Sequence, residues 1–140
     1  MVVERPFSIA NSSGDIVRGD PRYEEGGTPK PLLIVCDGST AHKDWGPFPY
    51  FGERFAQEGF ASILFNFSHN GIGGNFKRFT ELEKFSRNTI SKELEDVMPL
   101  SMRSARSDLG ATFVTMPRLE SWVIREAVVW RFSRRVSIHD

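Results

Sequence analysis

Short apolar runs separated by polar, glycine-rich turns dominate the first hundred residues of the chain. Residues 32–36 (LLIVC) and 61–67 (ASILFNF) are almost wholly apolar, as is typical of parallel strands that are buried on both faces. Near the start, alternating apolar residues flank the turn-forming segment NSSGD of residues 11–15, a pattern that predicts an antiparallel hairpin. We therefore expect a hairpin followed by two parallel strands.

Two further segments have the spacing of amphipathic helices. Residues 48–60 (FPYFGERFAQEGF) place aromatic side chains on one helical face, and Gly59 stands where a helix commonly ends. Residues 79–97 predict a second helix, with Thr80 and Glu83 as its capping box. A strand, a helix and a strand with short links form a βαβ unit. The fold class predicted is α/β, a β-hairpin plus a parallel βαβ unit.

The composition changes near Val97. Residues 1–97 hold eleven glycines, all five lysines, and eleven basic against fourteen acidic residues, for a net charge of −3. Residues 98–140 hold one glycine (Gly110), seven arginines and no lysine, with four acidic residues, for a net charge of +3. We interpret the chain as a partial α/β domain over 1–97 and an unrelated tail over 98–140.

The bulk composition argues against several classes of partner. The formal net charge is zero, which gives no electrostatic reason to expect nucleic acid or an anionic membrane, and no stretch is long and apolar enough to span a bilayer. Cys36 is the only cysteine and three histidines are far apart, so no metal site is expected. Without a leader-like N-terminus, a soluble, cytoplasmic protein is the expectation.

The order and spacing of four segments carry a resemblance to a known family. LLIVCDG, KDWGPFPYFGERFAQEGF, ILFNFSHNG and FSRNTISKELEDV follow one another over about residues 7–97. They resemble the N-terminal part of α/β-hydrolases of the esterase, dienelactone-hydrolase and acyl-peptidase kind. The resemblance implies the N-terminal half of a hydrolase sheet. It also implies hydrolysis of a small-molecule ester, thioester or peptide substrate by a serine nucleophile, without metal or organic cofactor.

The resemblance also implies a half-site. In this family a His-Gly-x turn follows the buried strand, and a backbone N–H of the turn faces the oxyanion of the acyl intermediate. The matching residues are Asp37, Gly38 and Ser39, so Ser39 is the oxyanion-hole candidate through its N–H, together with Gly38. Asp37 departs from the usual histidine. Asp37 and His69 are pocket candidates, with His69 expected to shape the loop rather than act as the base.

The catalytic residues implied by the family are missing from this sequence. A nucleophile elbow reads Gly-x-Ser-x-Gly, and residues 98–140 contain only Gly110, so no elbow can be formed there. No nucleophile, acid or base is therefore assigned. We expect residues 98–140 to be irregular or helical, and the central strand of the sheet to be absent.

A shift of reading frame accounts for both the break and the missing elbow. The third base of the Trp122 codon and the first two of Val123 must spell glycine. In this shifted frame each codon consists of the third base of one written codon and the first two bases of the next. The shifted codons that follow, through Val129, allow His, Ser, Arg and three glycines, so that WVIREAVVWRFSRR is compatible with GHSRGGGMAVLAA. The serine falls on the codons of Ile124 and Arg125. Loss of one base after the Val97 codon would produce this change, and it leaves a hydrolase family chain that is truncated and inactive as written.

Two alternatives remain for the tail. Residues 122–135 fit an amphipathic helix, and that helix is a better fit to the pattern than a basic aromatic segment that binds nucleic acid. The whole chain could also be a non-catalytic binding or regulatory module that uses its basic C-terminal tail to hold a partner.

Overall fold

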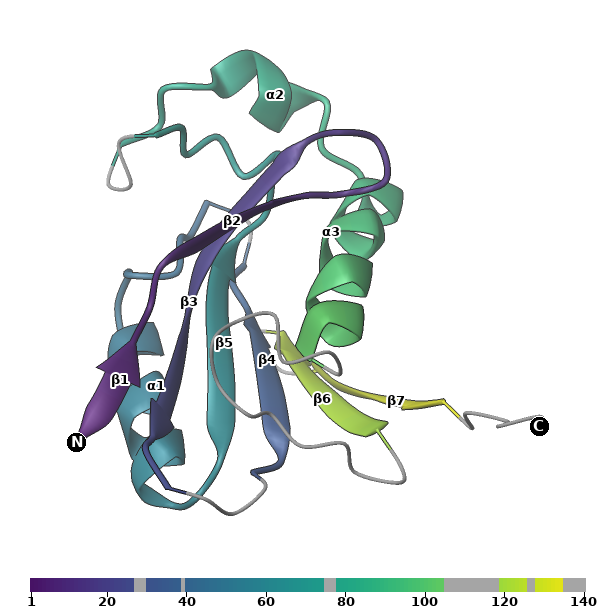
Figure 1. Cartoon of the computed structure of the whole chain (residues 1–140). Coiled ribbons are helices and arrows are strands. Elements are labelled where there is room, and N and C mark those ends of the chain that lie inside the picture. Colours follow the sequence, from purple (N-terminus) through teal and green to yellow (C-terminus); the bar gives the residue numbers. More distant parts are fainter. Residues whose placement is uncertain (27–29, 39, 75–77, 105–118, 126–127, 135–140) are drawn as a thin grey trace.

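The computed structural model describes residues 1–26, 30–38, 40–74, 78–104, 119–125 and 128–134 (Figure 1). For 102–104, 119–125 and 128–134 the description covers the backbone. Seven strands and three helices lie within these residues. They are β1 Val2–Glu4, β2 Phe7–Ala10, β3 Ile16–Glu24, β4 Leu32–Cys36, α1 Phe48–Gln57, β5 Ala61–Asn66, α2 Leu82–Ser86, α3 Ile90–Ser104, β6 Leu119–Arg125 and β7 Val128–Arg134.

All seven strands belong to one mixed sheet. Its order is β1-β3-β5-β4-β6-β7, and β2 pairs with β3 beside β1. Strands β4 and β5 are parallel and α1 connects them, which confirms the predicted βαβ unit. Strands β2 and β3 pair antiparallel around the turn at residues 11–15, which confirms the predicted hairpin. The predicted fold class, α/β, is that of the structure.

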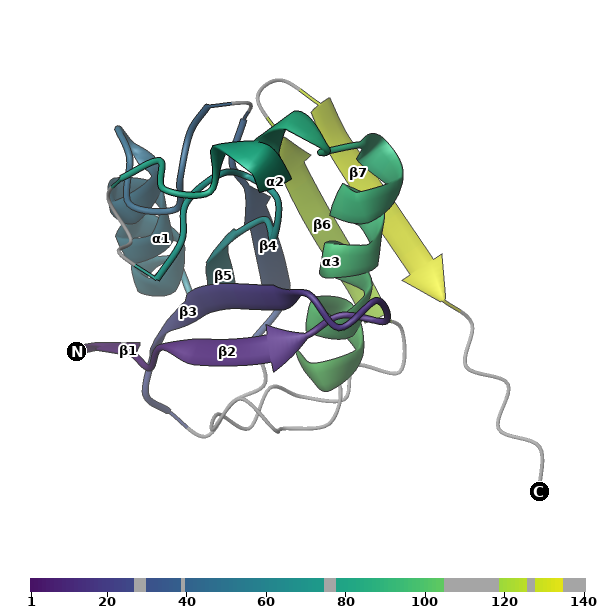
Figure 2. The same cartoon turned by 90° about the horizontal axis from the view of Figure 1, so that it is seen from above.

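The helices cover opposite faces of the sheet (Figure 2). Alternate residues of β5 point to the two faces, because side chains alternate along a strand. Ile63 and Phe65 belong to the main apolar cluster, to which α3 contributes Val97 and Leu100. On the other face, Leu64 lies against α1 at Gly52. Both parallel strands are therefore buried on both sides, as their apolar sequences predicted.

The helix predicted over 79–97 is in fact two helices. Helix α2 ends at Ser86, and α3 begins at Ile90 and continues past Val97 to Ser104. The predicted capping box at Thr80 and Glu83 is wrong, because α2 has no side-chain cap hydrogen bond. The cap lies at the second helix instead, where the Thr89 hydroxyl accepts the Lys92 N–H at 3.4 Å.

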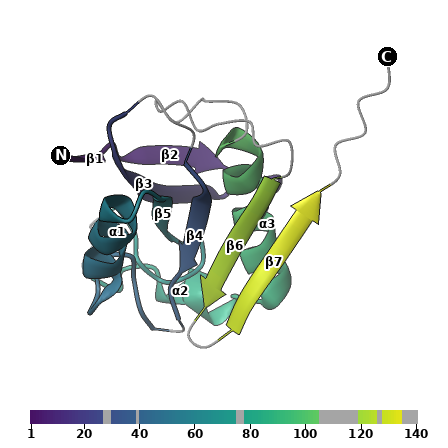
Figure 3. The same cartoon turned by 90° about the horizontal axis from the view of Figure 1, so that it is seen from below.

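The tail differs from the expectation over two stretches. Residues 119–125 and 128–134 form strands, where irregular or helical structure was predicted, and the alternative helix over 122–135 is likewise wrong. The segment is rich in β-branched and aromatic residues, which favour strands. Strand β6 pairs parallel with β4, so the central strand expected to be absent is present (Figure 3). Pairing there satisfies the backbone groups along β4.

Candidate functional site

Polar residues gather where the two parallel strands of the βαβ unit end. Asp37 and Gly38 follow β4, and Phe67 to Ile72 follow β5. In open α/β sheets the carboxyl ends of parallel strands are where ligands bind. Asp37, His69 and Asn70 are all buried here, Asp37 to 2% exposure. Buried polar side chains need partners, so the contacts of these residues define the candidate site.

Asp37 is held by the loop after β5. Its Oδ2 accepts a hydrogen bond from Asn70 Nδ2 at 3.2 Å. The side-chain oxygen of Asn70 in turn accepts the backbone N–H of Ile72 at 3.0 Å. The carboxylate that departs from the family histidine is thus bound to a neutral amide donor on the neighbouring loop.

A tight turn follows Asp37. The backbone N–H of Ala41 donates to the Gly38 carbonyl at 3.1 Å, and Thr40 has a φ of 72°. A positive φ at the third position of a turn is a conformation in which glycine is usual. For a β-branched residue this conformation is strained. Ser39, the predicted oxyanion donor, lies outside the described residues.

Lys43 anchors the far end of this loop. Its backbone N–H donates to Asn66 Oδ1 at 2.8 Å, and its ammonium group binds the carboxylates of Asp20 and Asp44. Burial lowers the pKa of Lys43, but hydrogen bonds and charges from the two aspartates outweigh this effect and raise it overall. The ammonium is therefore firmly charged, and it fixes the loop to β3 and to the end of β5.

Asp20 also pairs with Arg22 on the same strand. The Arg22 Nε lies 3.1 Å from Asp20 Oδ2, and its NH1 donates to the carbonyl of Pro49 at the start of α1 at 3.0 Å. These are buried ion pairs, in which each charge depends on the others for compensation. The network connects β3 to the loop through Lys43 and to α1 through Pro49, so it helps to fix the position of the loop at the candidate site.

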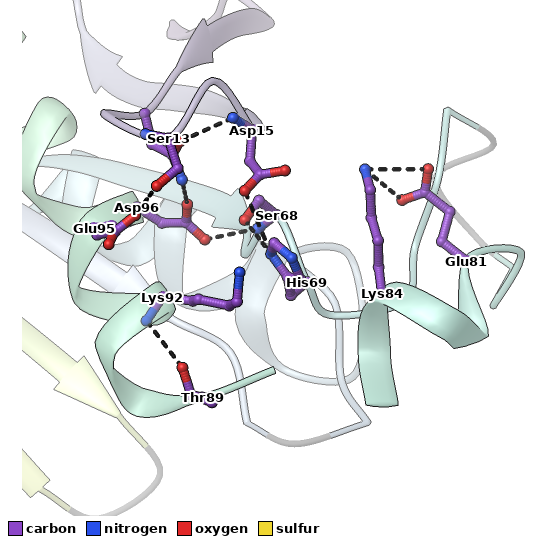
Figure 4. A network of polar contacts seen from close by, with 11 residues as sticks. Ser13, Asp15, Ser68, His69, Glu81, Lys84, Thr89, Lys92, Glu95 and Asp96 are labelled. Carbon is purple, nitrogen blue, oxygen red and sulfur yellow. Dashed lines mark hydrogen bonds and ion pairs between the residues drawn. The ribbon is translucent and has the colours of Figure 1, made fainter. Parts of the chain in front are cut away.

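His69 belongs to a different polar cluster, between the β2–β3 turn and α3 (Figure 4). Its Nδ1 lies 2.8 Å from Ser68 Oγ and 4.0 Å from Asp15 Oδ2. A catalytic base uses one ring nitrogen toward the nucleophile and the other toward an acidic partner. Here the hydroxyl and the carboxylate share one nitrogen. The pair of Ser68 and His69 is therefore no triad.

Sequence reasoning missed the residues that organise the site. Asn66, Asn70 and Lys43 supply its hydrogen bonds, and none of them was singled out. One available signal was position, since Asn66 ends a buried strand and Asn70 follows four residues later at the same edge of the sheet. Lys43 gave no signal, because its buried partner Asp20 is distant in sequence.

Three of the solved structures that are similar to this chain are esterases. Brefeldin A esterase, described as a bacterial homologue of human hormone-sensitive lipase, matches with a TM-score of 0.59 and 13% identity, over 89% of this chain and 31% of that one. Esterase Est22 matches at 0.65 and 11%, over 89% and 34%. A cold-adapted esterase from an Arctic intertidal metagenomic library matches at 0.65 and 13%, over 89% and 50%.

The shared feature is the mixed sheet with its helices on both faces. This is the N-terminal part of an α/β-hydrolase-like fold. The chain spans 31% to 50% of the length of these three structures. No protein-family model and no curated protein matches the sequence. At such low identities the likeness establishes the fold of the α/β-hydrolase part and leaves its chemistry to the residues themselves.

Among the residues that the structure describes, no group of three or more His, Cys, Asp or Glu side chains could hold a metal ion. None of the helices in the same residues is both long and apolar enough to cross a bilayer.

Proposed function

We propose that these 140 residues are built on the scaffold of a serine hydrolase of esters, thioesters or peptides. We propose further that they are inactive as written because a frame shift has replaced the nucleophile elbow. Within the sequence, no Gly-x-Ser-x-Gly occurs. The oxyanion side of the site would be the Gly38–Ala41 turn after β4. The serine side would lie on the adjacent strand, β6.

The register of β6 against β4 is the observation that carries this proposal. The two strands are parallel, with Val35 opposite Ile124 and Cys36 opposite Arg125. Parallel neighbours end at the same edge of a sheet. The two positions whose codons allow a serine in the neighbouring frame therefore stand beside the strand end that leads into Asp37 and Gly38. The codon argument depends on the sequence alone and the register on the structure, so the two observations support the proposal independently.

The neighbouring frame would also suit the local geometry. An elbow serine sits on a sharp turn between a strand and a helix, next to a backbone donor from the loop after the adjacent strand. Strand β6 ends at Arg125. In the written frame β7 pairs antiparallel with β6 from Val128 onward. In the other frame the codons allow the glycines and small apolar residues that an elbow and its helix require.

The proposal is tested by comparing two proteins from one gene. The protein as written and a version with one base restored after the Val97 codon are incubated with a short-chain aryl ester and with a fluorescent serine-directed phosphonate. We expect neither turnover nor labelling from the chain as written. The restored frame is read to its own stop codon so that it also supplies the acid and base that activate the serine, and it should be labelled at the new serine. Phosphonate-sensitive turnover by the chain as written would contradict the proposal.

A second candidate function is a non-catalytic binding or regulatory module. Its support is that the tail pairs in register with the sheet through β6 and β7. It requires a monodisperse protein that unfolds cooperatively and whose tail is needed to hold a partner. Size-exclusion chromatography and denaturant titration of the purified chain decide this point, and a heterogeneous or aggregating product would rule the module out.

A further inference from the structure

A single carboxylate on α3 joins three segments that are far apart in the sequence. Asp96 is 1% exposed. Its Oδ1 accepts a hydrogen bond from Asn11 Nδ2 in the β2–β3 turn at 2.8 Å. Its Oδ2 accepts the backbone N–H of Ser68, after β5, also at 2.8 Å (Figure 4). The ionised carboxylate can accept bonds at both oxygens, which an amide cannot do.

The bond to Ser68 falls inside a tight turn. The backbone N–H of Asn70 donates to the Phe67 carbonyl at 3.1 Å, so residues 67–70 form one closed unit with Ser68 within it. The side chain of Asn70 leaves this turn toward Asp37 Oδ2 at 3.2 Å. Fixing the Ser68 N–H therefore fixes the direction in which Asn70 points.

We propose that Asp96 is a positioning residue of the candidate site, acting through Ser68 and Asn70 on the carboxylate of Asp37. The inference rests on the proposed function only in treating the Gly38–Ala41 turn as the oxyanion side. By accepting the Ser68 N–H, Asp96 fixes the 67–70 turn in the conformation in which the Asn70 side chain donates its hydrogen bond to Asp37. A carboxylate that would oppose an oxyanion beside it is thereby bound to an amide of the neighbouring loop.

The position of Asp96 argues that its role extends beyond filling space. Burial raises its pKa, although the hydrogen bonds from Ser68 and Asn11 and the charge of His69 lower it. The chain thus keeps a titratable carboxyl group at a place where burial disfavours its ionised form. The carboxylate does there what an apolar residue of the same size could not do, which is to accept the Ser68 N–H.

The test is nuclear magnetic resonance on the full chain. In Asp96→Ala we expect the side-chain amide resonance of Asn70 to move. We also expect the Ile72 N–H, which donates to Asn70, to exchange roughly two to ten times faster, as loss of one hydrogen bond implies. In Asn70→Ala the signals of Asp37 and Gly38 should move in the same way as in Asp96→Ala.

Two controls separate positioning from general destabilisation. Glu95→Ala removes the neighbouring contact to Ser13 Oγ, at 2.6 Å, and leaves the 67–70 turn alone. Leu100→Ala opens the buried core on the same helix and lowers global stability, but a leucine side chain makes no hydrogen bond, so the hydrogen bonds of the 67–70 turn keep their partners. Neither control should move the Asn70 side-chain resonance.

A folded Asp96→Ala chain with an unmoved Asn70 resonance and unchanged Ile72 exchange would overturn the inference. If Asp96→Ala does not fold, Asp96→Asn serves instead, because its NH₂ group cannot accept the bond that Oδ1 or Oδ2 accepts, and the same resonances decide. These readouts need no nucleophile. Esterase turnover by the chain as written would remove the proposed function and leave this result intact.

Discussion

The side-chain nitrogen of Asn70 donates a 3.2 Å hydrogen bond to the carboxylate of Asp37 and so joins the ends of β5 and β4. Both residues are buried. The bond settles where the acidic side chain after β4 goes, which is to the loop that follows the next strand of the sheet. The candidate site thus consists of the loops after β4 and β5, which are joined by this hydrogen bond.

Removing the Asp37 carboxylate should leave a buried amide donor without its acceptor. We expect Asp37→Ala to lower the free energy of unfolding by about 1–3 kcal/mol. Denaturant titration measures this. Glu58→Ala, which removes a surface pair with Arg54, is the control and should change stability by less than about 1 kcal/mol. Equal free energies of unfolding for Asp37→Ala and the unmodified chain would show that the hydrogen bond between Asn70 and Asp37 does not stabilise the fold.

Breaking the ion-pair network under the loop should be more costly. Asp20→Asn leaves the charges of Lys43 and Arg22 without their shared buried partner. We expect a loss of roughly 3–5 kcal/mol in unfolding free energy, as for other buried pairs that lose one member. The exposed pair of Arg54 and Glu58 provides the comparison, and a loss as small as that of Glu58→Gln would refute the structural role of the network.

Thr40 should be improved by glycine and not by alanine. Its φ of 72° strains any residue that has a Cβ atom. We expect Thr40→Gly to be more stable than Thr40→Ala by about 1 kcal/mol, because both lose the side chain but only glycine relieves the strain. Thermal unfolding of the two variants is the measurement, and the reverse order would mean that Thr40 is not in the left-handed region.

The stability contributed by Asp96 should depend on pH in a direction set by its raised pKa. A raised pKa means that the folded chain binds this proton more tightly than the unfolded chain does. The contribution is fully present below the unfolded-state pKa of about 3.9 and is lost as pH rises through the higher folded-state pKa. Relative to Asp96→Asn, the free energy of unfolding of the unmodified chain should therefore fall as the pH rises from the unfolded-state pKa to the folded-state pKa of Asp96. A flat or opposite difference between the two pH profiles would contradict this sign.

Close packing of β3 on β5 should make Gly19 irreplaceable. A Cβ atom there would lie 2.5 Å from the Leu64 carbonyl oxygen, which is backbone and cannot give way. We expect Gly19→Ala to lower the unfolding free energy by about 1–3 kcal/mol. Gly26→Ala is the matched control, because a Cβ atom at Gly26 meets nothing within 4 Å, and it should be nearly neutral. Similar effects at the two glycines would contradict the predicted close contact.

The parts of the fold that a local pattern determines were predictable from sequence. The apolar runs of β4 and β5 and the cap at Gly59, whose φ is 85°, followed from burial and turn chemistry. The break between α2 and α3 was missed because the 79–97 stretch is amphipathic throughout. Strands β6 and β7 were missed because the spacing of their charged residues resembles that of a helix. Their β-branched and aromatic residues favour strands, and β6 forms one by pairing with the edge of β4.

The site was predictable only in part. The resemblance pointed to Asp37 and Gly38. The hydrogen bond between Asp37 and Asn70 spans 33 residues of sequence, and the hydrogen bond between Ser68 and Asp96 spans 28. No local pattern reports such bonds. His69 was expected to shape the loop rather than act as the base, and in the structure its Nδ1 faces Ser68 and Asp15.

The nucleotide sequence from the Val97 codon onward tests the central claim most directly. If a frame shift replaced the elbow, the frame that begins at the third base of each written codon continues without stops and reads Gly-His-Ser-Arg-Gly across the codons from Trp122. The serine would then fall at Ile124 and Arg125, beside the end of β4. Stop codons in that frame, or any residue other than serine at that position, would contradict the account.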